Sequence, residues 1–278
     1  MFGKARSQSN ITDGIGRPGL PVQRADTVMT PKLALACLAL PLLAVPASAE
    51  SFRSAYTVSY LGMPVARSSF TTTLSGDSFS IDGTLSSAGL AKLFDSTKGT
   101  VKVSGSLGPK GTQTDDYRVD YRSGGKEKRT VVRFKGGTVT HTENVPPPRP
   151  RGEDWVALGP DDLKAVSDPI AATIVRAGSL DEVCSRTIRT YDGELRADLK
   201  LSPVERSEWN GQPTAVCKVS FEPVSGYRST KRALRFLRDK SRMSIEFTAL
   251  GATGLYAPVR ASVGTEIGTI RITAAEPD

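Results

Sequence analysis

The sequence holds few of the residues on which common catalytic and metal sites depend. Its 278 residues include 1 His and 3 Cys. A single histidine excludes zinc sites that are built on several histidines. The apolar run from Leu33 to Val45 is too short for a stop-transfer helix, which needs about 20 apolar residues. These absences leave exported globular proteins and binding proteins as better candidates than metalloenzymes or polytopic membrane proteins.

Aromatic residues are also scarce, at 6%, and the charge is moderately positive, with 37 Lys and Arg against 29 Asp and Glu. The basic residues form no long patch with interleaved aromatics, which argues against a nucleic-acid partner. A modest excess of positive charge, spread along the chain, fits a protein near an anionic surface such as a membrane leaflet or lipopolysaccharide. We therefore expect peripheral contact with an anionic membrane and no nucleic-acid binding.

Residues 29–49 have the pattern of a secretory signal peptide. Lys32 supplies the positive charge, Leu33 to Val45 the apolar core, and Ala47-Ser48-Ala49 the small-residue cleavage site. The pattern predicts export with cleavage after Ala49, which makes Glu50 the first mature residue. No transmembrane span is expected once this segment is removed.

Met29 lies where a start codon would be natural. Residues 1–28 are polar and patternless, and we expect them to be a misassigned, disordered upstream extension. The alternative is a cytoplasmic extension of an uncleaved anchor, so the choice between Met1 and Met29 stays open. Residues 50–278 are expected to form a single β-rich domain, because all-β domains of about 200–250 residues commonly fold as one unit.

The cysteines divide between the signal and the mature chain. The residues before Cys37 do not form a lipoprotein box, so Cys37 is expected to leave with the signal. Cys184 and Cys217 remain, and an even count in an exported chain predicts one disulfide. Two buried free thiols are the alternative. A CxxC redox pair is excluded by the spacing.

Short runs with alternating apolar and polar residues dominate the mature chain, and this period is typical of strands with one wet face. Gly-Gly, Asn-Gly and Asp-Gly pairs separate several of them and favour hairpins. The runs cover residues 54–60, 67–74, 79–85, 100–107, 116–122, 129–134, 138–142, 186–191, 195–201, 215–221, 243–250, 257–263 and 268–273. They predict a mainly β fold: a single curled antiparallel sheet, either a half-barrel or a β-spiral.

One or two short helices are expected to interrupt the strands. Residues 87–94 place Leu90, Leu93 and Phe94 on one helical face. Residues 168–178 begin with Asp168 as N-cap and end with a glycine placed as C′, which is typical of a short helix. Such a helix would plug the open side of a curled sheet. The polyproline stretch at residues 146–152 is interpreted as a rigid connector, with a partner-docking segment as the alternative.

No complete catalytic or metal-binding set is present. His141 would need an acid and a nucleophile to act as a general base, and no motif supplies them. The pairs Asp115-Asp116 and Asp161-Asp162 lack the spacing of a calcium loop, and the second is expected in the first turn of a short helix over residues 160–166. Glu153-Asp154 beside Trp155 is a weak sugar-binding pattern. We expect no catalytic residue, no metal and no cofactor.

Two features could contact a ligand or partner. Asp192-Gly193 joins two strand-like runs and predicts a type I′ turn, with ligand contact by Asp192 as the alternative. The densest basic stretch, residues 228–242, is interpreted as a solvated strand edge, with contact to an anionic lipid or polyanion as the alternative. The residues that would make this contact are Arg232, Arg235, Arg238 and Arg242.

Several segments together resemble one protein family. They are Tyr56 to Gly62, Asp168-Pro-Ile-Ala-Ala followed by Cys184, Thr190 to Leu199, the Cys217 segment with Pro223 to Tyr227, and Pro258-Val-Arg260 with Gly268. This pattern resembles the domain of unknown function 3108 family over essentially the whole mature chain. The resemblance implies an exported envelope protein of Gram-negative bacteria, located in the periplasm. It also implies a shape similar to periplasmic β-spirals and to half-barrel lipoprotein carriers of the Lol type, which does not by itself give a function.

The leading expectation is a non-catalytic periplasmic protein that supports the cell envelope. It would hold a lipid, a lipoprotein segment or another hydrophobic ligand on the concave side of the sheet. The alternatives are a scaffold that binds another envelope protein and a cell-wall hydrolase. A carrier should show an apolar cavity lined by alternate strand residues, and an enzyme should show His141 beside a carboxylate and a hydroxyl.

Overall fold

A computed structural model describes residues 49–89 and 96–275. Residues 1–28, the predicted signal peptide up to residue 48, and most of the helix expected over residues 87–94 lie outside the described residues. Within the described ranges, no helix is both long and apolar enough to cross a membrane.

The fold is mainly β, as the alternating runs predicted, and every run in that list lies on a strand, with at most one residue extending beyond an end of that strand. The strands are β1 (Glu50–Tyr60), β2 (Met63–Ser75), β3 (Ser78–Ser87), β4 (Lys98–Gly108), β5 (Gly111–Ser123), β6 (Lys126–Lys135), β7 (Thr138–Val145), β8 (Trp155–Val156), β9 (Val175–Arg176), β10 (Thr187–Tyr191), β11 (Arg196–Trp209), β12 (Gln212–Ser225), β13 (Tyr227–Arg228), β14 (Met243–Ala249), β15 (Leu255–Thr265) and β16 (Gly268–Ala274).

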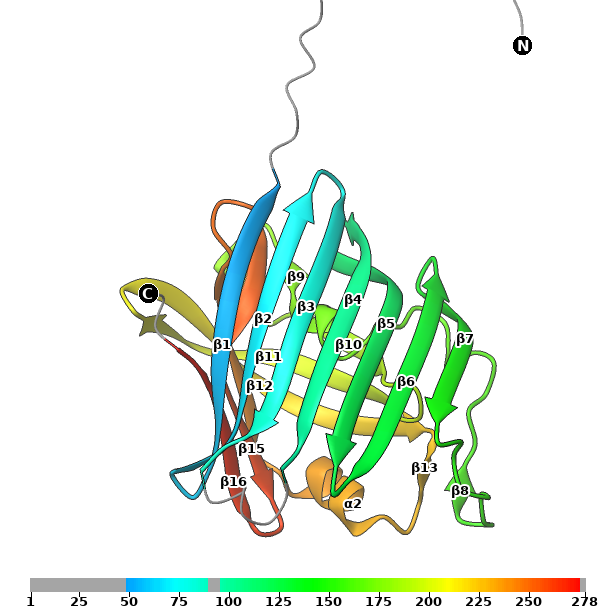
Figure 1. Ribbon diagram of the computed structural model, residues 1–278. Helices are drawn as coiled ribbons and strands as arrows, with labels where there is room; N and C mark the ends of the chain where they lie inside the picture. The colour runs from blue at the N-terminus through cyan, green and yellow to red at the C-terminus, as the bar shows by residue number, and fades with distance from the viewer. Residues whose placement is uncertain (1–48, 90–95, 276–278) are drawn as a thin grey trace, which may run out of the picture. The chain divides into compact units, whose positions relative to one another are not determined.

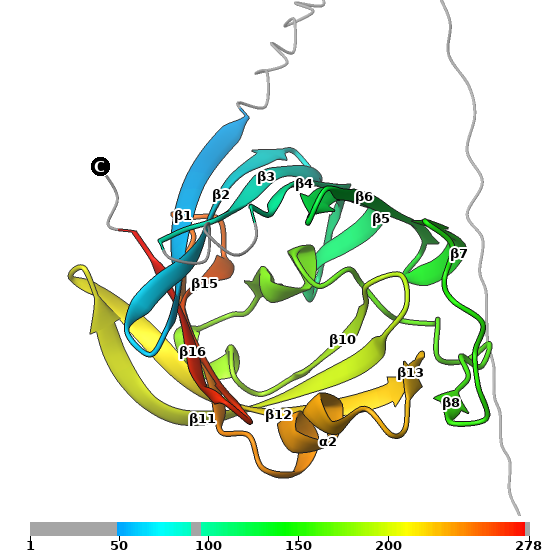
Figure 2. The same ribbon diagram turned by 60° about the horizontal axis from the view of Figure 1, so that its bottom comes forward.

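Neighbouring strands pair antiparallel in the order β10-β11-β12-β14-β15-β16-β1-β2-β3-β4-β5-β6-β7. The first strand therefore pairs with the last, with Tyr56 opposite Ala274. The sheet curls on itself (Figure 1), and viewed from one end it surrounds an interior (Figure 2). This single curled antiparallel sheet, which closes into a barrel-like structure, confirms the predicted fold class.

The inner segment, residues 157–186, runs inside this curl (Figure 2). The helix predicted over residues 168–178 is wrong. Only one 3₁₀ turn forms, η1 (Ala171–Thr173), and the next residues are the two-residue strand β9. Val175 pairs with Tyr256 of β15 on one side and with Gly111 of β5 on the other. These backbone hydrogen bonds across the interior replace the helical ones that the local pattern favoured.

The inner segment also joins the two ends of the sheet. The Val139 N–H of β7 donates to Leu163 O at 3.0 Å, and the Ser167 N–H donates to Arg189 O of β10 at 3.0 Å. Further along the same seam, the side-chain amide of Asn144 on β7 donates to Gly193 O of the β10–β11 turn at 2.9 Å. The barrel is therefore closed by backbone bonds along one stretch and by side chains along another.

Apolar side chains on alternate strand positions pack on the inner segment in two clusters. The first joins β2 to β6 with Val166, Ala171 and Ile174 of the inner segment. The second lies under β10 to β14 and contains Val183, Cys184 and Cys217. The interior of the curl is thus filled over much of its volume by the chain's own middle.

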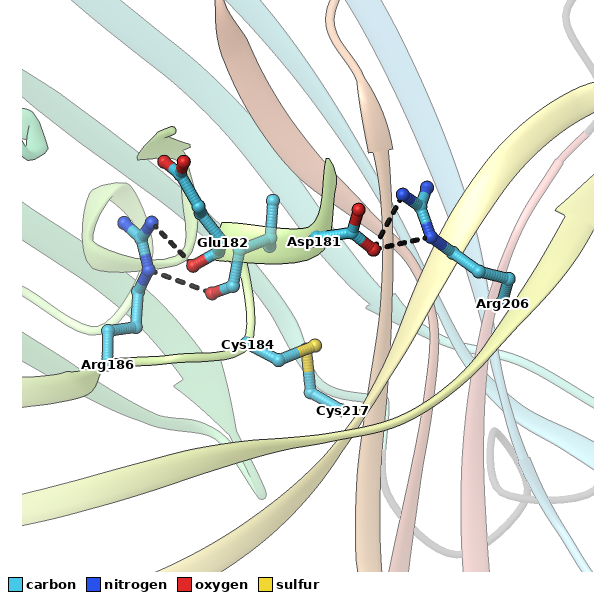
Figure 3. Close-up of a disulfide and its surroundings, with 7 residues drawn as sticks. Asp181, Glu182, Cys184, Arg186, Arg206 and Cys217 are labelled. Atoms are coloured by element: carbon cyan, nitrogen blue, oxygen red, sulfur yellow. Dashed lines mark hydrogen bonds and ion pairs between the residues drawn. A yellow bond between two sulfur atoms is a disulfide. The ribbon is translucent and has the colours of Figure 1, made fainter. Parts of the chain in front are cut away.

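Cys184 and Cys217 form the predicted disulfide, with their Cα atoms 5.3 Å apart (Figure 3). It joins the end of the inner segment to β12. Beside it, Arg206 of β11 pairs with Asp181 at 2.7 Å, and Arg186 donates to Val183 O at 2.8 Å (Figure 3). The short 3₁₀ helix η2 (Leu180–Glu182) is therefore fixed to the sheet by covalent and polar contacts together.

Most predicted two-residue turns have the required left-handed backbone. Asn210 and Gly211 have φ of 48° and 73°, which a type I′ turn needs at both positions. The type I′ prediction for Asp192-Gly193 is wrong. Of that pair only Gly193 has a positive φ, 103°, and four residues separate β10 from β11. The Asp192 carboxylate accepts the backbone N–H groups of Glu194 and Leu195, which stabilises this longer turn.

Candidate functional site

A cavity of about 810 Å³ lies where the wall formed by β5 to β7 meets the β10–β11 turn, β13 and the α-helix α2 (Arg232–Asp239). We call it the mouth cavity. The polyproline stretch at residues 146–148 lines it as well. The elements β8, β13 and α2 lie together at one end of the barrel (Figure 1, bottom). The inner segment crosses the barrel nearer the other end, where β9 pairs with the first residue of β5. The mouth cavity therefore opens at the end that the inner segment leaves uncovered.

The lining of the mouth cavity is amphipathic. Its apolar and aromatic members include Val119, Tyr121, Leu195, Tyr227 and Leu234. Six cations line it against two carboxylates, Asp192 and Glu194; the cations are Lys126, Lys128, Arg129, Arg149, Arg228 and Lys231. The Lys128 ammonium lies 5.5 Å from the centre of the Tyr121 ring. An apolar surface with a cationic surplus around it suits a molecule that has one apolar part and one anionic part.

The dense basic stretch contributes a helix and not the strand edge that its alternation suggested. In α2, Leu234 is buried while Arg232, Arg235 and Arg238 are exposed, because the helical period places them on other faces. Lys240 closes the helix by donating its N–H to Phe236 O at 2.9 Å. From this stretch the mouth cavity takes Arg228, Lys231 and Leu234.

The four arginines predicted to contact a ligand lie outside the mouth cavity. Arg232 is 3.5 Å from the Glu266 carboxylate, and Arg238 pairs with Asp239 at 2.7 Å. Arg235 and Arg242 are exposed. These side chains therefore form part of the outer surface beside the cavity. Asp192, the fifth predicted contact, does line the cavity, although its carboxylate is engaged by the β10–β11 turn.

Asp154 fixes one side of the cavity. Its carboxylate accepts from Arg228 at 2.6 Å and from the Thr230 hydroxyl at 2.5 Å, and its carbonyl accepts the Ser229 N–H at 2.7 Å. The Thr230 hydrogen bond and then the Arg228 guanidinium hold the pKa of Asp154 below its ordinary value. Arg228 is thereby held at the edge of the cavity, in register with Trp155. In the weak sugar-binding pattern at residues 153–155, Asp154 thus mainly connects this segment to residues 228–230.

Trp155 gives the cavity an aromatic side chain with an unused donor. Its ring lies under the Arg151 guanidinium, 4.6 Å from the ring centre. Its indole nitrogen is buried and meets no acceptor among the residues that the structure describes. Buried polar groups normally have a partner. Trp155 is therefore a natural reporter of any change in the mouth cavity.

A smaller cavity of about 270 Å³ lies deeper, between the inner segment and the strands on either side of the β1–β16 junction. Its wall is mostly apolar and includes Phe70, Ile81, Ile170, Ile245 and Ile272. On β1, it takes the alternate residues 54, 56 and 58, as expected for the concave face of a sheet. The apolar cavity expected of a carrier is thus present, although the inner segment has reduced it to a small volume.

The residues considered for catalysis do not come together. His141 is exposed on β7, in register with Arg133, and is not among the residues lining the mouth cavity. The helix expected over residues 160–166 is absent. These residues form turns, in which Asp162 accepts the Gly159 N–H at 2.8 Å and Asp161 pairs with Lys164 at 2.7 Å. Nowhere in residues 49–89 and 96–275 do three or more His, Cys, Asp or Glu gather as metal ligands.

Comparison with known proteins identifies a family for this chain. No curated protein matches the chain. One protein-family model, described as "Protein of unknown function (DUF3108)", matches residues 55–275, from the first strand to just beyond the last. The match covers the disulfide, the inner segment and every strand around the two cavities. The chain therefore belongs to the DUF3108 family.

Proposed function

We propose that this chain is a non-catalytic periplasmic protein that binds an anionic amphiphile, a molecule with an apolar part and a negatively charged group, in the mouth cavity. The observation that carries the proposal is the lining itself, which combines apolar and aromatic side chains with six cations and two carboxylates. The volume of about 810 Å³ lies within the usual range for small-molecule sites.

The physical argument has two parts. Removing apolar surface from water stabilises a complex by roughly 25 cal/mol per Å². This term favours placing an apolar chain against Val119, Leu195 and Leu234. The surplus of cations attracts the negatively charged group and orients it toward the outer edge of the cavity. A purely apolar ligand would use the first term alone, so the lining favours an amphiphile.

Features outside the cavity support the periplasmic and non-catalytic parts of the proposal. Disulfides persist in oxidising compartments, and the Cys184–Cys217 bond belongs to this class. Strand β1 begins at Glu50, the residue predicted to follow signal cleavage. His141 lies on an exposed strand position in register with an arginine, where it has no role in the cavity.

The direct test is native mass spectrometry of residues 50–278 purified gently from periplasm, followed by lipid extraction of the same sample. The expected result is a co-purifying mass that extracts as an anionic lipid or fatty acid. A bare protein mass, together with no binding of added anionic amphiphile, would overturn the proposal and favour the scaffold alternative.

A binding measurement tests the site. In a Trp209→Phe background, Trp155 is the only tryptophan, because the chain holds 2 Trp. Its fluorescence should change on titration with lysophosphatidylglycerol below its micelle concentration. Lys128→Gln/Lys231→Gln should weaken this binding by about tenfold, since each partly exposed charge pair is worth up to about 1 kcal/mol.

The matched control is Lys200→Gln/Lys218→Gln, which removes the same charge from exposed positions of β11 and β12. This control should bind lysophosphatidylglycerol like the parent. Zwitterionic lysophosphatidylcholine should show a much smaller response to the cavity substitutions. Equal weakening by the control pair, or equal loss for both lipids, would contradict a specific anionic site.

A further inference from the structure

Three large apolar side chains are exposed on two turns that touch each other. Leu61 of the β1–β2 turn is 64% exposed, and Met63, the first residue of β2, is 49% exposed. Ile267 of the β15–β16 turn is 77% exposed. The Tyr60 hydroxyl donates to Ile267 O and so joins the two turns. A Cβ placed on Gly268 would come within 2.9 Å of the Tyr60 ring and 3.4 Å of Leu61, which shows how closely the turns approach.

Basic residues of α2 and the segment after it lie beside these turns. Arg232 reaches Glu266, the neighbour of Ile267, at 3.5 Å. The Ser241 hydroxyl donates to Gly264 O at 2.7 Å, which fixes the end of this segment to the same hairpin. Arg235, Lys240 and Arg242 are exposed, and no carboxylate of the described chain lies within ion-pair distance of them. The surface here is positively charged around an apolar centre.

We propose that this surface docks on an anionic lipid membrane. The docking rim consists of Leu61, Met63 and Ile267 with the cations Arg232, Arg235, Lys240 and Arg242. The aliphatic side chains would enter the headgroup region, and the cations would meet the negative charges of the lipids. The inference deepens the proposed function and rests on it for the identity of the cargo, because α2 belongs to the rim and also lines the mouth cavity through Leu234.

Charge and shape favour a lipid surface over a protein partner. The apolar side chains stand at the ends of two hairpins, where each can enter a fluid interface separately. Clustered cations next to a membrane contribute affinity additively, at about fivefold per Lys or Arg near an anionic surface. The rim therefore meets both requirements of a peripheral membrane contact, an apolar anchor and a positive field.

The test is flotation of residues 50–278 with phosphatidylcholine vesicles that contain or lack phosphatidylglycerol. The parent should float with the phosphatidylglycerol vesicles and bind far more weakly to pure phosphatidylcholine. Leu61→Glu/Ile267→Glu and, separately, Arg235→Gln/Arg242→Gln should each weaken binding by about tenfold or more. The matched control is Val204→Glu, at an equally exposed aliphatic of β11 (59% exposed), which should bind like the parent.

The same variants are then titrated with lysophosphatidylglycerol through Trp155 fluorescence. Retained amphiphile binding with lost vesicle binding supports the rim as a separate docking surface. If vesicle binding survives both rim variants, or if Val204→Glu reduces it equally, the proposed docking rim is wrong. The proposal for the mouth cavity is not affected by either result. If the parent protein binds vesicles but does not bind lysophosphatidylglycerol, the proposed function is overturned instead.

Discussion

Replacing Asp168 with alanine should lower the free energy of unfolding by about 3 kcal/mol, because three buried donors lose their acceptor. The Asp168 side chain is fully buried. Its carboxylate accepts the Thr114 hydroxyl of β5 and the N–H groups of Ile170 and Ala171 at 2.8 and 2.9 Å. These bonds fasten the inner segment to the sheet, so their loss should loosen the filling of the barrel. Urea unfolding followed by circular dichroism measures the change.

Asp168→Asn is the informative partner variant, since it keeps an acceptor for both N–H groups and carries no charge. Burial raises the pKa of Asp168 above its ordinary 3.8, against the hydrogen bonds that favour the carboxylate. The folded protein then holds the proton more tightly than the unfolded chain does. The stability that this proton contributes is fully present below the pKa of Asp168 in the unfolded chain. It is lost as the pH rises through the pKa of Asp168 in the folded protein.

The stability of wild-type protein relative to Asp168→Asn should therefore fall as the pH rises above about 3.8. Near neutral pH, the free energy of unfolding of the Asn variant should lie within about 1 kcal/mol of the wild-type value. The Ala variant should be much less stable than either. Unfolding curves of the three proteins at a series of pH values test this. A wild-type advantage that grows with pH would show that the carboxylate is the favoured buried form.

Removing the disulfide should have a similarly large effect. The bond closes a loop with a sequence separation of 33 residues. A loop of this length stabilises the fold by roughly 3–4 kcal/mol in the chain-entropy account. Cys184→Ala/Cys217→Ala should lower the melting temperature and unfold at lower denaturant. Alanine is preferred to serine here because both cysteines are at most 1% exposed, and a buried hydroxyl would add its own cost.

Wild-type protein unfolded and refolded under reducing conditions serves as the control and should match the double variant. Native protein treated with the same reductant should keep its disulfide longer, because the bond is accessible only after unfolding. A double variant that is as stable as the oxidised protein would contradict the expectation that this bond holds the inner segment on β12.

The strands were predictable because each has one apolar and one polar face, and burial on one side imposes a period of two. Val101 and Val103 are buried between exposed neighbours, and the same alternation recurs from β2 to β6. The hairpin at Asn210-Gly211 followed from its residues alone. The disulfide prediction followed from the even number of cysteines that remain after the predicted signal peptide.

The two helical regions were not predictable from local pattern. Asp168 does accept N–H groups of the residues after it, as an N-cap should, yet the chain leaves the helix within one turn because Val175 finds backbone partners on both β5 and β15. In α2 the apolar residues fit both a helical and an alternating period. Long-range strand pairing therefore ended the helix predicted over residues 168–178. In α2, burial of Leu234 favoured the helix over a strand.

The mouth cavity escaped prediction for a different reason. Its lining comes from β5, β6, the polyproline stretch, the β10–β11 turn and α2, and only the closure of the sheet brings these together. Lys128 and Lys231 have no sequence feature that sets them apart from the other cations. A signal existed only for Asp192, whose family pattern suggested a contact.

The pairing of β1 with β16 has a consequence for how the polypeptide is made. Strand β1 is synthesised early, but it can complete its hydrogen bonds only after β16 is available. Until then β1 and β15 both present unpaired edges, which are templates for pairing with other chains. Contacts of such high sequence separation also slow folding. The nascent polypeptide therefore depends on being kept unfolded and apart from its copies until its final strand has been translated.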